Sequence, residues 1–274
     1  MTEQLAAIPL PEPDIRKLQQ IELGILNRFS EICKKYHLAY FITAGTLLGA
    51  VRHQGFIPWD DDIDVAMPRK DYNRLRKICR KHLDGQFFFQ DHRTEPDYPF
   101  YFAKIRRKNT EVCEESLIGV QMDKGIYIDI FPLDRCPRSE LGGKLFFKGI
   151  ELLNCALMAK VNPSFSCGYS KRQMRMLFAL LKRCPKPLLA CLREGLRWLC
   201  SWGGRFCTVG GAHGYPREAY RKEWFASCVQ LEFEGESYPA PAGWHELLSH
   251  MYGDYRKPPE EQEKTGHFIS WGVR

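Results

Sequence analysis

Apolar residues recur every three or four positions over residues 18–36, and this spacing predicts an amphipathic helix whose N-cap is Asp14. The β-prone run 39–43 predicts a short strand, which a glycine-containing turn ends at residues 44–46. Residues 47–51 then predict a short helix. The N-terminal part is therefore expected to contain a helix, a strand and a second helix in succession.

A second strand is predicted at residues 63–67, where an aspartate interrupts a β-prone run of apolar residues. Pro68 follows and predicts the start of a basic helix with one apolar face. Two further strands are expected at residues 101–105 and 126–131, and Pro132 is expected to end the latter. Together these segments predict an α/β fold.

Long helical patterns replace the mixed pattern between about residues 139 and 202, and three prolines interrupt them: Pro163, Pro185 and Pro187. We therefore expect an α/β core with a mixed sheet over residues 14–138 and a basic helical insertion over residues 139–205. The C-terminal segment, residues 206–274, is expected to return to the core.

The composition is that of an ordinary globular protein, with 274 residues of which 44% are hydrophobic and 27% are charged. The longest stretch free of Asp, Glu, Lys and Arg covers the 16 residues 36–51, fewer than the roughly 18 that would predict a membrane span. The N-terminal residues lack the basic and apolar regions of a secretory signal. We therefore expect neither a membrane span nor a signal peptide.

The eleven cysteines are odd in number and include no Cys-x-x-Cys pair, which argues against a disulfide framework and a structural zinc site. They are expected to be reduced thiols of a cytoplasmic protein. The net charge of +7 suits anionic partners such as nucleotides or lipid head groups. Nucleic acid is not an expected partner, because the sequence shows no helix-turn-helix, zinc-finger or aromatic RNA-binding pattern.

Two aspartates, Asp62 and Asp64, flank Ile63 at the start of the second predicted strand. Side chains alternate along a strand, so both carboxylates are expected on one face, about 7 Å apart. They repel each other unless a cation lies between them, and such hard oxygen ligands suit Mg²⁺ or Mn²⁺ bound together with substrate phosphates. A solvated turn rich in aspartate is the alternative that this pattern leaves open.

The turn at Gly45 and Thr46 lies between a predicted strand and a predicted helical turn. Glycine lets backbone amides approach an anion and a helix start offers partial positive charge, so both residues are candidates for binding phosphate. Arg52, in the expected loop, is a candidate for a bidentate contact with phosphate. His53, its neighbour, is a further candidate for binding the nucleotide or its phosphates, with a structural histidine as the alternative.

The run over residues 41–68 resembles the signature of the LicD family, and it is similar to the fukutin-related proteins of the nucleotidyltransferase superfamily. The resemblance implies a nucleotidyltransferase-like core that transfers phosphocholine from CDP-choline to a bacterial surface glycan such as lipopolysaccharide or teichoic acid. Eukaryotic relatives handle CDP-linked polyols. The resemblance also implies that Gly45, Thr46, Asp62 and Asp64 are active-site residues, together with a third acidic residue on a later strand.

Asp129 is the best match to that third residue, because residues 128–134 are similar to a second landmark of the family. By strand alternation Asp129 shares a face with Tyr127 and Phe131. A lone carboxylate in an apolar strand is costly unless it is paired or bound to metal. A hydrogen-bonded structural carboxylate is the alternative.

Residues 101–110 look like the family's basic strand, on which Lys104 and Arg106 share one face and are candidates for neutralising the donor phosphates. Arg107 and Lys108, which follow them, are equally well explained as solvated residues of a basic edge strand. Residues 251–255 resemble a third landmark, which continues with Pro258, Pro259 and His267.

The insertion is strongly basic, since residues 171–205 carry nine lysines and arginines against the single acid Glu194, interleaved with leucines and aromatic residues. Such helices can lie in an anionic membrane interface, which would suit a lipid-linked acceptor and a protein at the inner face of the membrane. A helical subdomain packed on the core, with solvated charges, is the other interpretation.

As a whole, the resemblance implies a Mg²⁺-dependent transferase in which Asp62, Asp64 and Asp129 bind metal and carry catalysis. Its donor would be CDP-choline or another CDP-alcohol, its acceptor a glycan or lipid-linked glycan, and its by-product CMP. A nucleotidyltransferase acting on nucleoside triphosphates and a non-catalytic membrane-associated scaffold are the alternatives. A choline group would require an aromatic cage, for which the candidates are Trp59, Tyr98, Tyr101, Tyr127, Trp244 and Trp271.

Overall fold

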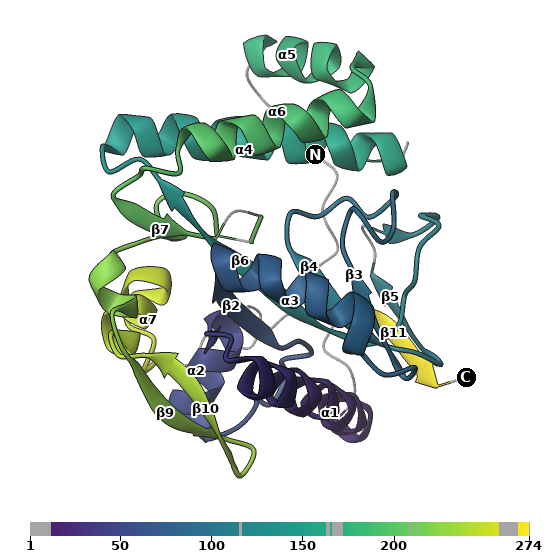
Figure 1. Cartoon of the computed structure of the whole chain (residues 1–274), viewed down its shortest axis with the longest axis vertical. Coiled ribbons are helices and arrows are strands. Elements are labelled where there is room, and N and C mark those ends of the chain that lie inside the picture. The colour runs from purple at the N-terminus through teal and green to yellow at the C-terminus, as the bar shows by residue number, and fades with distance from the viewer. Residues whose placement is uncertain are drawn as a thin grey trace.

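The computed structural model describes residues 12–114, 117–162, 165, 172–208, 210–211, 213–257 and 268–273. Its centre is a mixed sheet in which neighbouring strands follow the order β1-β2-β6-β4-β3, with β7 and β8 continuing from β6 (Figure 1). Only β2 and β6 pair in parallel among the described strands of this sheet. The strands are β1 (Phe41–Ile42), β2 (Asp64–Pro68), β3 (Phe87–Gln90), β4 (Ala103–Arg107), β6 (Tyr127–Cys136), β7 (Arg205–Cys207) and β8 (Ala219–Tyr220). The predicted α/β class is confirmed.

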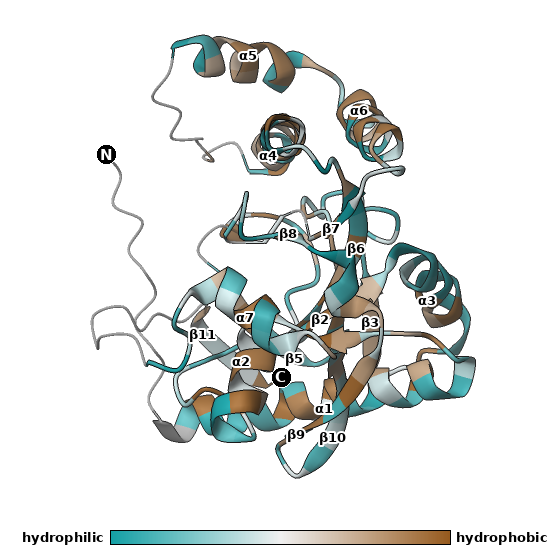
Figure 2. Cartoon of the chain, turned by 90° about the vertical axis from the view of Figure 1, so that its left-hand side faces the viewer, coloured by the Kyte–Doolittle hydropathy of each residue, from teal (hydrophilic) through white to brown (hydrophobic). Residues whose placement is uncertain are grey.

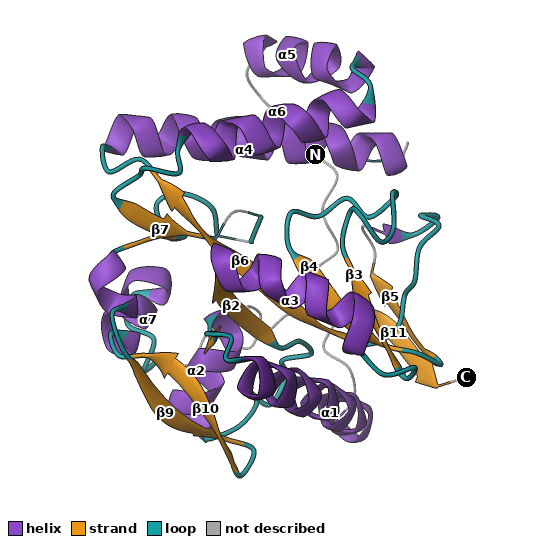
Figure 3. Ribbon diagram, in the orientation of Figure 1, coloured by secondary structure: helices purple, strands orange, loops and turns teal. Residues whose placement is uncertain are grey.

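Helices α1 (Glu12–Tyr36) and α3 (Arg69–His82) lie on the same side of this sheet (Figure 3). The apolar stripe of α1 is buried, as at Leu18, Ile25 and Phe29, because the 3.6-residue period brings these side chains to one face. The helix begins two residues before Asp14, which is therefore not its N-cap. Pro68 precedes the first residue of α3, as predicted.

The prediction that Pro132 ends its strand is wrong, because β6 continues to Cys136. The backbone N–H of Asp129 points toward β2, where it donates to the Ile63 carbonyl oxygen at 2.8 Å. Alternate residues point to opposite sides, so the Pro132 nitrogen points away from β2. On that side β4 pairs as far as Ile130 and β7 begins at Asp134, so proline falls where the partner strand changes.

The predicted helical insertion contains α4 (Glu140–Val161), α5 (Arg172–Arg183) and α6 (Lys186–Leu199). Ser139 caps α4 by accepting a hydrogen bond from the Gly142 N–H. Helices α4 and α6 pack together, and Figure 2 shows α5 as the outermost element. No residue of α5 is buried. Pro163 lies outside the described residues, whereas Pro185 precedes α6.

The C-terminal part adds elements around the sheet: the 3₁₀ helix η2 (Lys222–Phe225), the hairpin of β9 (Cys228–Phe233) and β10 (Glu236–Pro241), and α7 (Trp244–Tyr252). Strand β11 (Phe268–Val273), for which no strand was predicted, pairs with β5 (Thr110–Glu114). Within the described residues, no helix is long and apolar enough to cross a membrane.

Candidate active site

Asp64 and Asp129 are direct neighbours on the two parallel strands of the sheet, where they are register partners. Paired residues on adjacent strands project to the same face, and their strands lie about 4.8 Å apart. Two hydrogen bonds of 2.8 Å hold this register: Asp64 N–H donates to Thr46 Oγ1, and Asp129 N–H donates to the Ile63 carbonyl oxygen. The fold thus brings together two carboxylates that lie far apart in the sequence.

Asp62 lies in the loop that leads into β2, two residues before Asp64. Burial raises the pKa of Asp129 to about 6 against the opposing effect of Lys104, and the nearby negative charge of Asp62 raises it further. The same aspartates act on Tyr252, since burial and the charges of Asp64, Asp60 and Asp62 raise its pKa. Asp62, Asp64 and Asp129 therefore share one electrostatic neighbourhood, with Tyr252 of α7 beside it.

Lys104 lies on the same face, directly opposite Asp129 in the antiparallel pair of β4 and β6. Its ammonium nitrogen is 2.9 Å from Asp129 Oδ1 and 3.9 Å from Glu114 Oε2, and it lies 3.2 Å from the centre of the Tyr127 ring. The side chain is 2% exposed. Lys104 thus neutralises Asp129, and its ammonium is already bound by protein groups.

Arg106 shares the face of Lys104 but is turned toward other partners. It donates from Nε to Gln90 Oε1 at 2.5 Å and from Nη1 to the Gly125 carbonyl oxygen at 2.6 Å, and Nη2 lies 3.7 Å from Glu114 Oε1. It is fully buried. These contacts tie β3, β4 and the segment before β6 together, so Arg106 holds the sheet rather than facing the carboxylates.

The predicted phosphate-binding turn is part of α2 (Ala44–His53), which begins earlier than expected. A side chain at Gly45 would place its Cβ 2.7 Å from Asp60 Oδ2, so the glycine makes room for the acidic loop. The neighbouring Thr46 is buried and holds the Asp64 backbone. Both residues position the carboxylate loop against α2.

Arg52 and His53 are not in a loop, because they form the last turn of α2. At a rise of 1.5 Å per residue, that turn is roughly 10 Å along the helix from Gly45. His53 is largely exposed, but the part of its ring that is covered, together with the charge of Arg52, lowers its pKa. The structure therefore separates these two residues from the start of α2.

Glu22 of α1, which was not among the predicted site residues, is fully buried. In the part of the chain that the structure describes, neither carboxylate oxygen has a hydrogen-bond partner. Burial raises the pKa of Glu22, with the charges of Asp62, Asp61 and Asp60 adding to the rise. A signal was present in the sequence, since Glu22 falls on the apolar stripe four residues after Leu18.

Asp61, which the sequence analysis did not single out, links the acidic loop to the C-terminal strand. It is buried, and its Oδ2 accepts a hydrogen bond from the Phe268 N–H at 2.9 Å. The Phe268 ring packs edge-on against Tyr127, with 5.4 Å between centroids. The loop is thus held by α2 and by β11. Pro258, Pro259 and His267 of the third landmark lie outside the described residues.

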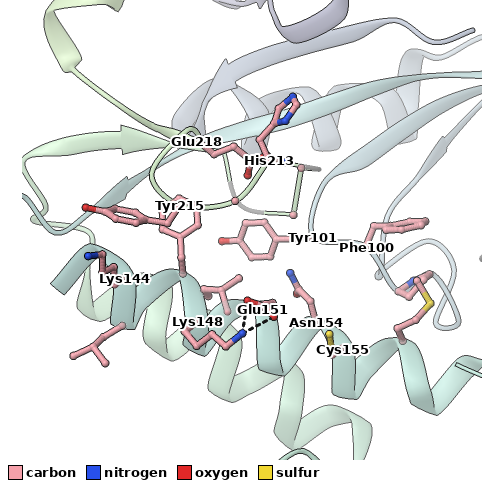
Figure 4. Close-up of a pocket in the computed structure, with 18 of the residues that line it drawn as sticks. Phe100, Tyr101, Lys144, Lys148, Glu151, Asn154, Cys155, His213, Tyr215 and Glu218 are labelled. Carbon is pink, nitrogen blue, oxygen red and sulfur yellow. Dashed lines mark hydrogen bonds and ion pairs between the residues drawn. The ribbon is translucent and has the colours of Figure 1, made fainter. Parts of the chain in front are cut away.

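A pocket of about 790 Å³ opens between α4 and the segment around residues 210–218 (Figure 4). Its walls are mostly apolar and include the rings of Phe100, Tyr101, Phe147 and Tyr215. Tyr101 is the one member of the predicted aromatic cage that lines it. Tyr127 instead covers Lys104, and Tyr98 is buried against Phe100.

The oxygen-only donor set of Asp62, Asp64 and Asp129 fits a hard divalent cation such as Mg²⁺. In the part of the chain that the structure describes, no three His, Cys, Asp or Glu side chains form a ready-made metal site. Mg²⁺ commonly uses only one or two protein carboxylates, together with waters and substrate phosphates, so these residues suffice for it.

Comparison with known proteins adds an independent line of evidence. Residues 37–140 match the family model described as LicD/FKTN/FKRP, nucleotidyltransferase domain, which spans the acidic loop and Asp129. Over 48 residues the chain is 50% identical to an uncharacterized protein of Rickettsia prowazekii (18% of both chains) and 48% identical to one of Rickettsia typhi (18% of this chain, 16% of the relative).

A longer match is with the lipopolysaccharide cholinephosphotransferase LicD of Haemophilus influenzae. The two are 30% identical over 271 residues, covering 92% of this chain and 96% of the relative. Similarity therefore extends through the helical insertion and the C-terminal segment. With this match along nearly the full length of both chains, the protein belongs to the LicD family.

Proposed function

We propose that this protein transfers phosphocholine from CDP-choline to a hydroxyl group of a surface glycan and releases CMP. The observation that carries the proposal is the register of Asp64 and Asp129, which places two carboxylates side by side within the segment that matches the family model. The LicD relative of Haemophilus influenzae is named as a lipopolysaccharide cholinephosphotransferase, which supports this substrate and acceptor class.

Asp62 and Asp64 would hold Mg²⁺, which when bound neutralises charge on the donor diphosphate. Asp129 would orient the acceptor hydroxyl and accept its proton, because burial raises the pKa of this carboxyl to about 6. Lys104 keeps Asp129 in place through the 2.9 Å ion pair. Phosphoryl transfer asks little covalent chemistry of a protein, so positioning and charge neutralisation carry most of the catalysis.

The experiment that tests this function follows two labels. The protein is given Mg²⁺, a lipopolysaccharide or teichoic acid acceptor, and CDP-choline labelled either in the choline methyl groups or in the cytidine ring. We expect choline label in the glycan and cytidine label in free CMP. Cytidine label in the glycan, or pyrophosphate released from CTP, would instead indicate an ordinary nucleotidyltransferase.

Asp62→Asn and Asp64→Asn are the informative variants, because each removes one charge and keeps the shape of the side chain. Turnover should fall at least 100-fold in both. Asp14→Asn, an exposed aspartate on the first turns of α1, is the matched control and should keep full activity. Vesicle binding without any turnover or nucleotide binding would support the non-catalytic scaffold.

We further propose that the helical layer formed by α4, α5 and α6 contacts an anionic membrane. Large apolar side chains are exposed at the start of α4 and at or just beyond the end of α6: Trp202 at 92%, Leu141 and Leu199 at 70%, and Trp198 at 67%. Arg138 and Gly204 pack together, so these two helix ends lie near each other. Basic side chains accompany them: Arg138, Lys144, Arg197 and Arg205. Such a surface suits anionic head groups and the upper part of the acyl chains.

Sedimentation with phosphatidylglycerol vesicles tests the contact. The wild-type protein should co-sediment at low salt and less at high salt, while phosphatidylcholine vesicles should bind it weakly. A double substitution, Trp198→Ser with Trp202→Ser, should abolish binding. Ile118→Ser, which removes an exposed apolar side chain outside the helical layer, is the control and should bind normally. Equal vesicle binding by the double tryptophan variant and by Ile118→Ser would contradict the proposal.

A further inference from the structure

The pocket between α4 and residues 210–218, called the α4 pocket below, has a wall of aromatic rings. Phe100 and Tyr101 come from the segment before β4, Phe147 comes from α4, and Tyr215 comes from the opposite wall. The rings of Phe147 and Tyr215 lie 5.6 Å apart between centroids. Figure 4 shows the Tyr101 ring between Tyr215 and Phe100. The faces of such rings carry partial negative charge, which attracts cations.

Glu218 adds a buried carboxylate to this pocket. Its Oε1 accepts a hydrogen bond from the His213 N–H at 2.9 Å, whereas Oε2 is buried and has no hydrogen-bond partner among the described residues. A side chain at Gly211 would place its Cβ 2.3 Å from Oε1, so only glycine lets the backbone close over this carboxylate. Burial raises the pKa of Glu218 to about 7, although the backbone amides of His213, Gly214 and Gly211 oppose the rise.

Cationic side chains around the α4 pocket already have partners. Lys148 binds Glu151 at 2.8 and 3.0 Å, Lys144 binds Glu140, and Arg193 donates to Asn154 Oδ1 at 3.0 Å. Glu218, by contrast, forms no ion pair with any residue that the structure describes. An aromatic, mostly apolar pocket thus holds a carboxylate without a cation.

Two chains of side-chain contacts connect the α4 pocket with the candidate active site. The Phe100 ring lies 5.4 Å from Lys104 Nζ, which is 2.9 Å from Asp129 Oδ1. On the other side, the His213 ring contacts Tyr252 at 5.3 Å, and the charges of Asp64 and Glu218 both act on Tyr252. Side-chain contacts therefore connect both ends of the pocket wall to the neighbourhood of the carboxylates.

We propose that the α4 pocket binds the quaternary ammonium group of the phosphocholine unit, with the rings of Phe147 and Tyr215 beside the methyl groups and Glu218 as counter-ion. The inference rests on the proposed function, since it takes phosphocholine as the group transferred. The pocket would select against a polyol, because mostly apolar walls leave hydroxyl groups without hydrogen-bond partners.

Binding of two ligands of nearly equal shape tests the proposal without relying on turnover. Phosphocholine is compared with 3,3-dimethylbutyl phosphate, in which carbon replaces the charged nitrogen, by isothermal titration calorimetry with the full chain. We expect phosphocholine to bind at least tenfold more tightly. Glu218→Gln should reduce that preference to less than threefold, and Tyr215→Leu should weaken phosphocholine binding at least fivefold. Tyr215→Phe keeps the ring and should bind as the wild type does.

Phe87→Leu, which removes an aromatic ring on β3 outside the pocket, is the control and should leave the preference unchanged. Melting temperatures show whether each variant is folded, and Tyr215→Leu decides the matter if Glu218→Gln unfolds. Equal affinity of the wild type for both ligands, or wild-type affinity in Tyr215→Leu, would overturn the inference. CMP release with such a result leaves the proposed function standing. If phosphocholine binds as expected but no CMP is released, the proposed transferase function is contradicted and the proposed ammonium-binding pocket is supported.

Discussion

The ammonium of Lys104 lies 2.9 Å from Asp129 Oδ1 and 3.2 Å from the centre of the Tyr127 ring. A buried lysine with these neighbours acts as a permanent counter-ion for the carboxylate, and removing one member of a buried pair leaves an uncompensated charge. Lys104→Met should therefore lower the free energy of unfolding by about 3 to 5 kcal/mol in urea titrations at neutral pH. The double variant Lys104→Met with Asp129→Asn should recover most of that loss. Equal stability of the single and double variants would show that the pair is not coupled.

Thr46 connects α2 to the acidic loop through its hydroxyl, which accepts from the Asp64 N–H. Thr46→Val keeps the shape and leaves that buried N–H unpaired, which should cost about 1 to 3 kcal/mol of stability. Turnover should also fall, since Asp64 loses the bond that holds its backbone. Thr46→Ser retains the hydroxyl and should restore both quantities. Urea unfolding and initial rates measure the two effects, and equal behaviour of Val and Ser variants would contradict the role.

Glu22 makes the stability of the protein depend on pH. Burial raises the pKa of Glu22 in the folded protein, so the folded state holds its proton at pH values where the unfolded chain, with a pKa near 4.3, has lost it. Stability should therefore fall as pH rises above about 4.3. Glu22→Gln should match the wild type at pH 4 and exceed it at pH 8 in denaturant titrations. Glu31→Gln, an exposed acid on the same helix, should show no such divergence. A constant difference between Glu22→Gln and the wild type at all pH values would contradict this account.

Divalent cations should stabilise the folded protein if Asp62 and Asp64 hold one. A ligand that binds only the folded state raises stability with its concentration, by about 2.7 kcal/mol at 100 times its Kd. Mg²⁺ and Mn²⁺ should therefore raise the melting temperature of the wild type and of Asp14→Asn in scanning calorimetry. The increase should disappear in Asp62→Asn and Asp64→Asn. A shift of the same size in all four proteins would place the cation elsewhere.

The sequence predicted the main elements because their patterns are local. The apolar stripe of α1 and the β-prone runs at β2, β4 and β6 are visible in short windows. The pairing of Asp64 with Asp129 followed only from the family resemblance, since register between distant strands leaves no local trace. For the same reason Lys104 was expected to face phosphate: its partners Asp129 and Glu114 lie on other strands.

Other elements could not be predicted because tertiary contacts create them. Strand β11 was not predicted, and it forms because β5, which lies far away in the sequence, offers a partner edge. Strand β6 continues through Pro132 because one antiparallel partner, β4, ends before that position and the next, β7, begins after it. The α4 pocket combines residues before β4, on α4 and near β8, which no spacing in the sequence connects.

The hydrogen bond from Phe268 to Asp61 joins residues 207 positions apart. A ribosome makes the acidic loop early and Phe268 late, so the loop of a growing chain lacks this bond until the last strand has emerged from the exit tunnel. Without residue 268 the acidic loop would keep its bonds to the first two helices, where Gln19 donates to the Asp60 carbonyl oxygen and Thr46 accepts from the Asp64 N–H. It would lose the bond that reaches it from the far end of the chain, so the position of Asp61 depends on a segment that no neighbouring stretch of sequence can replace.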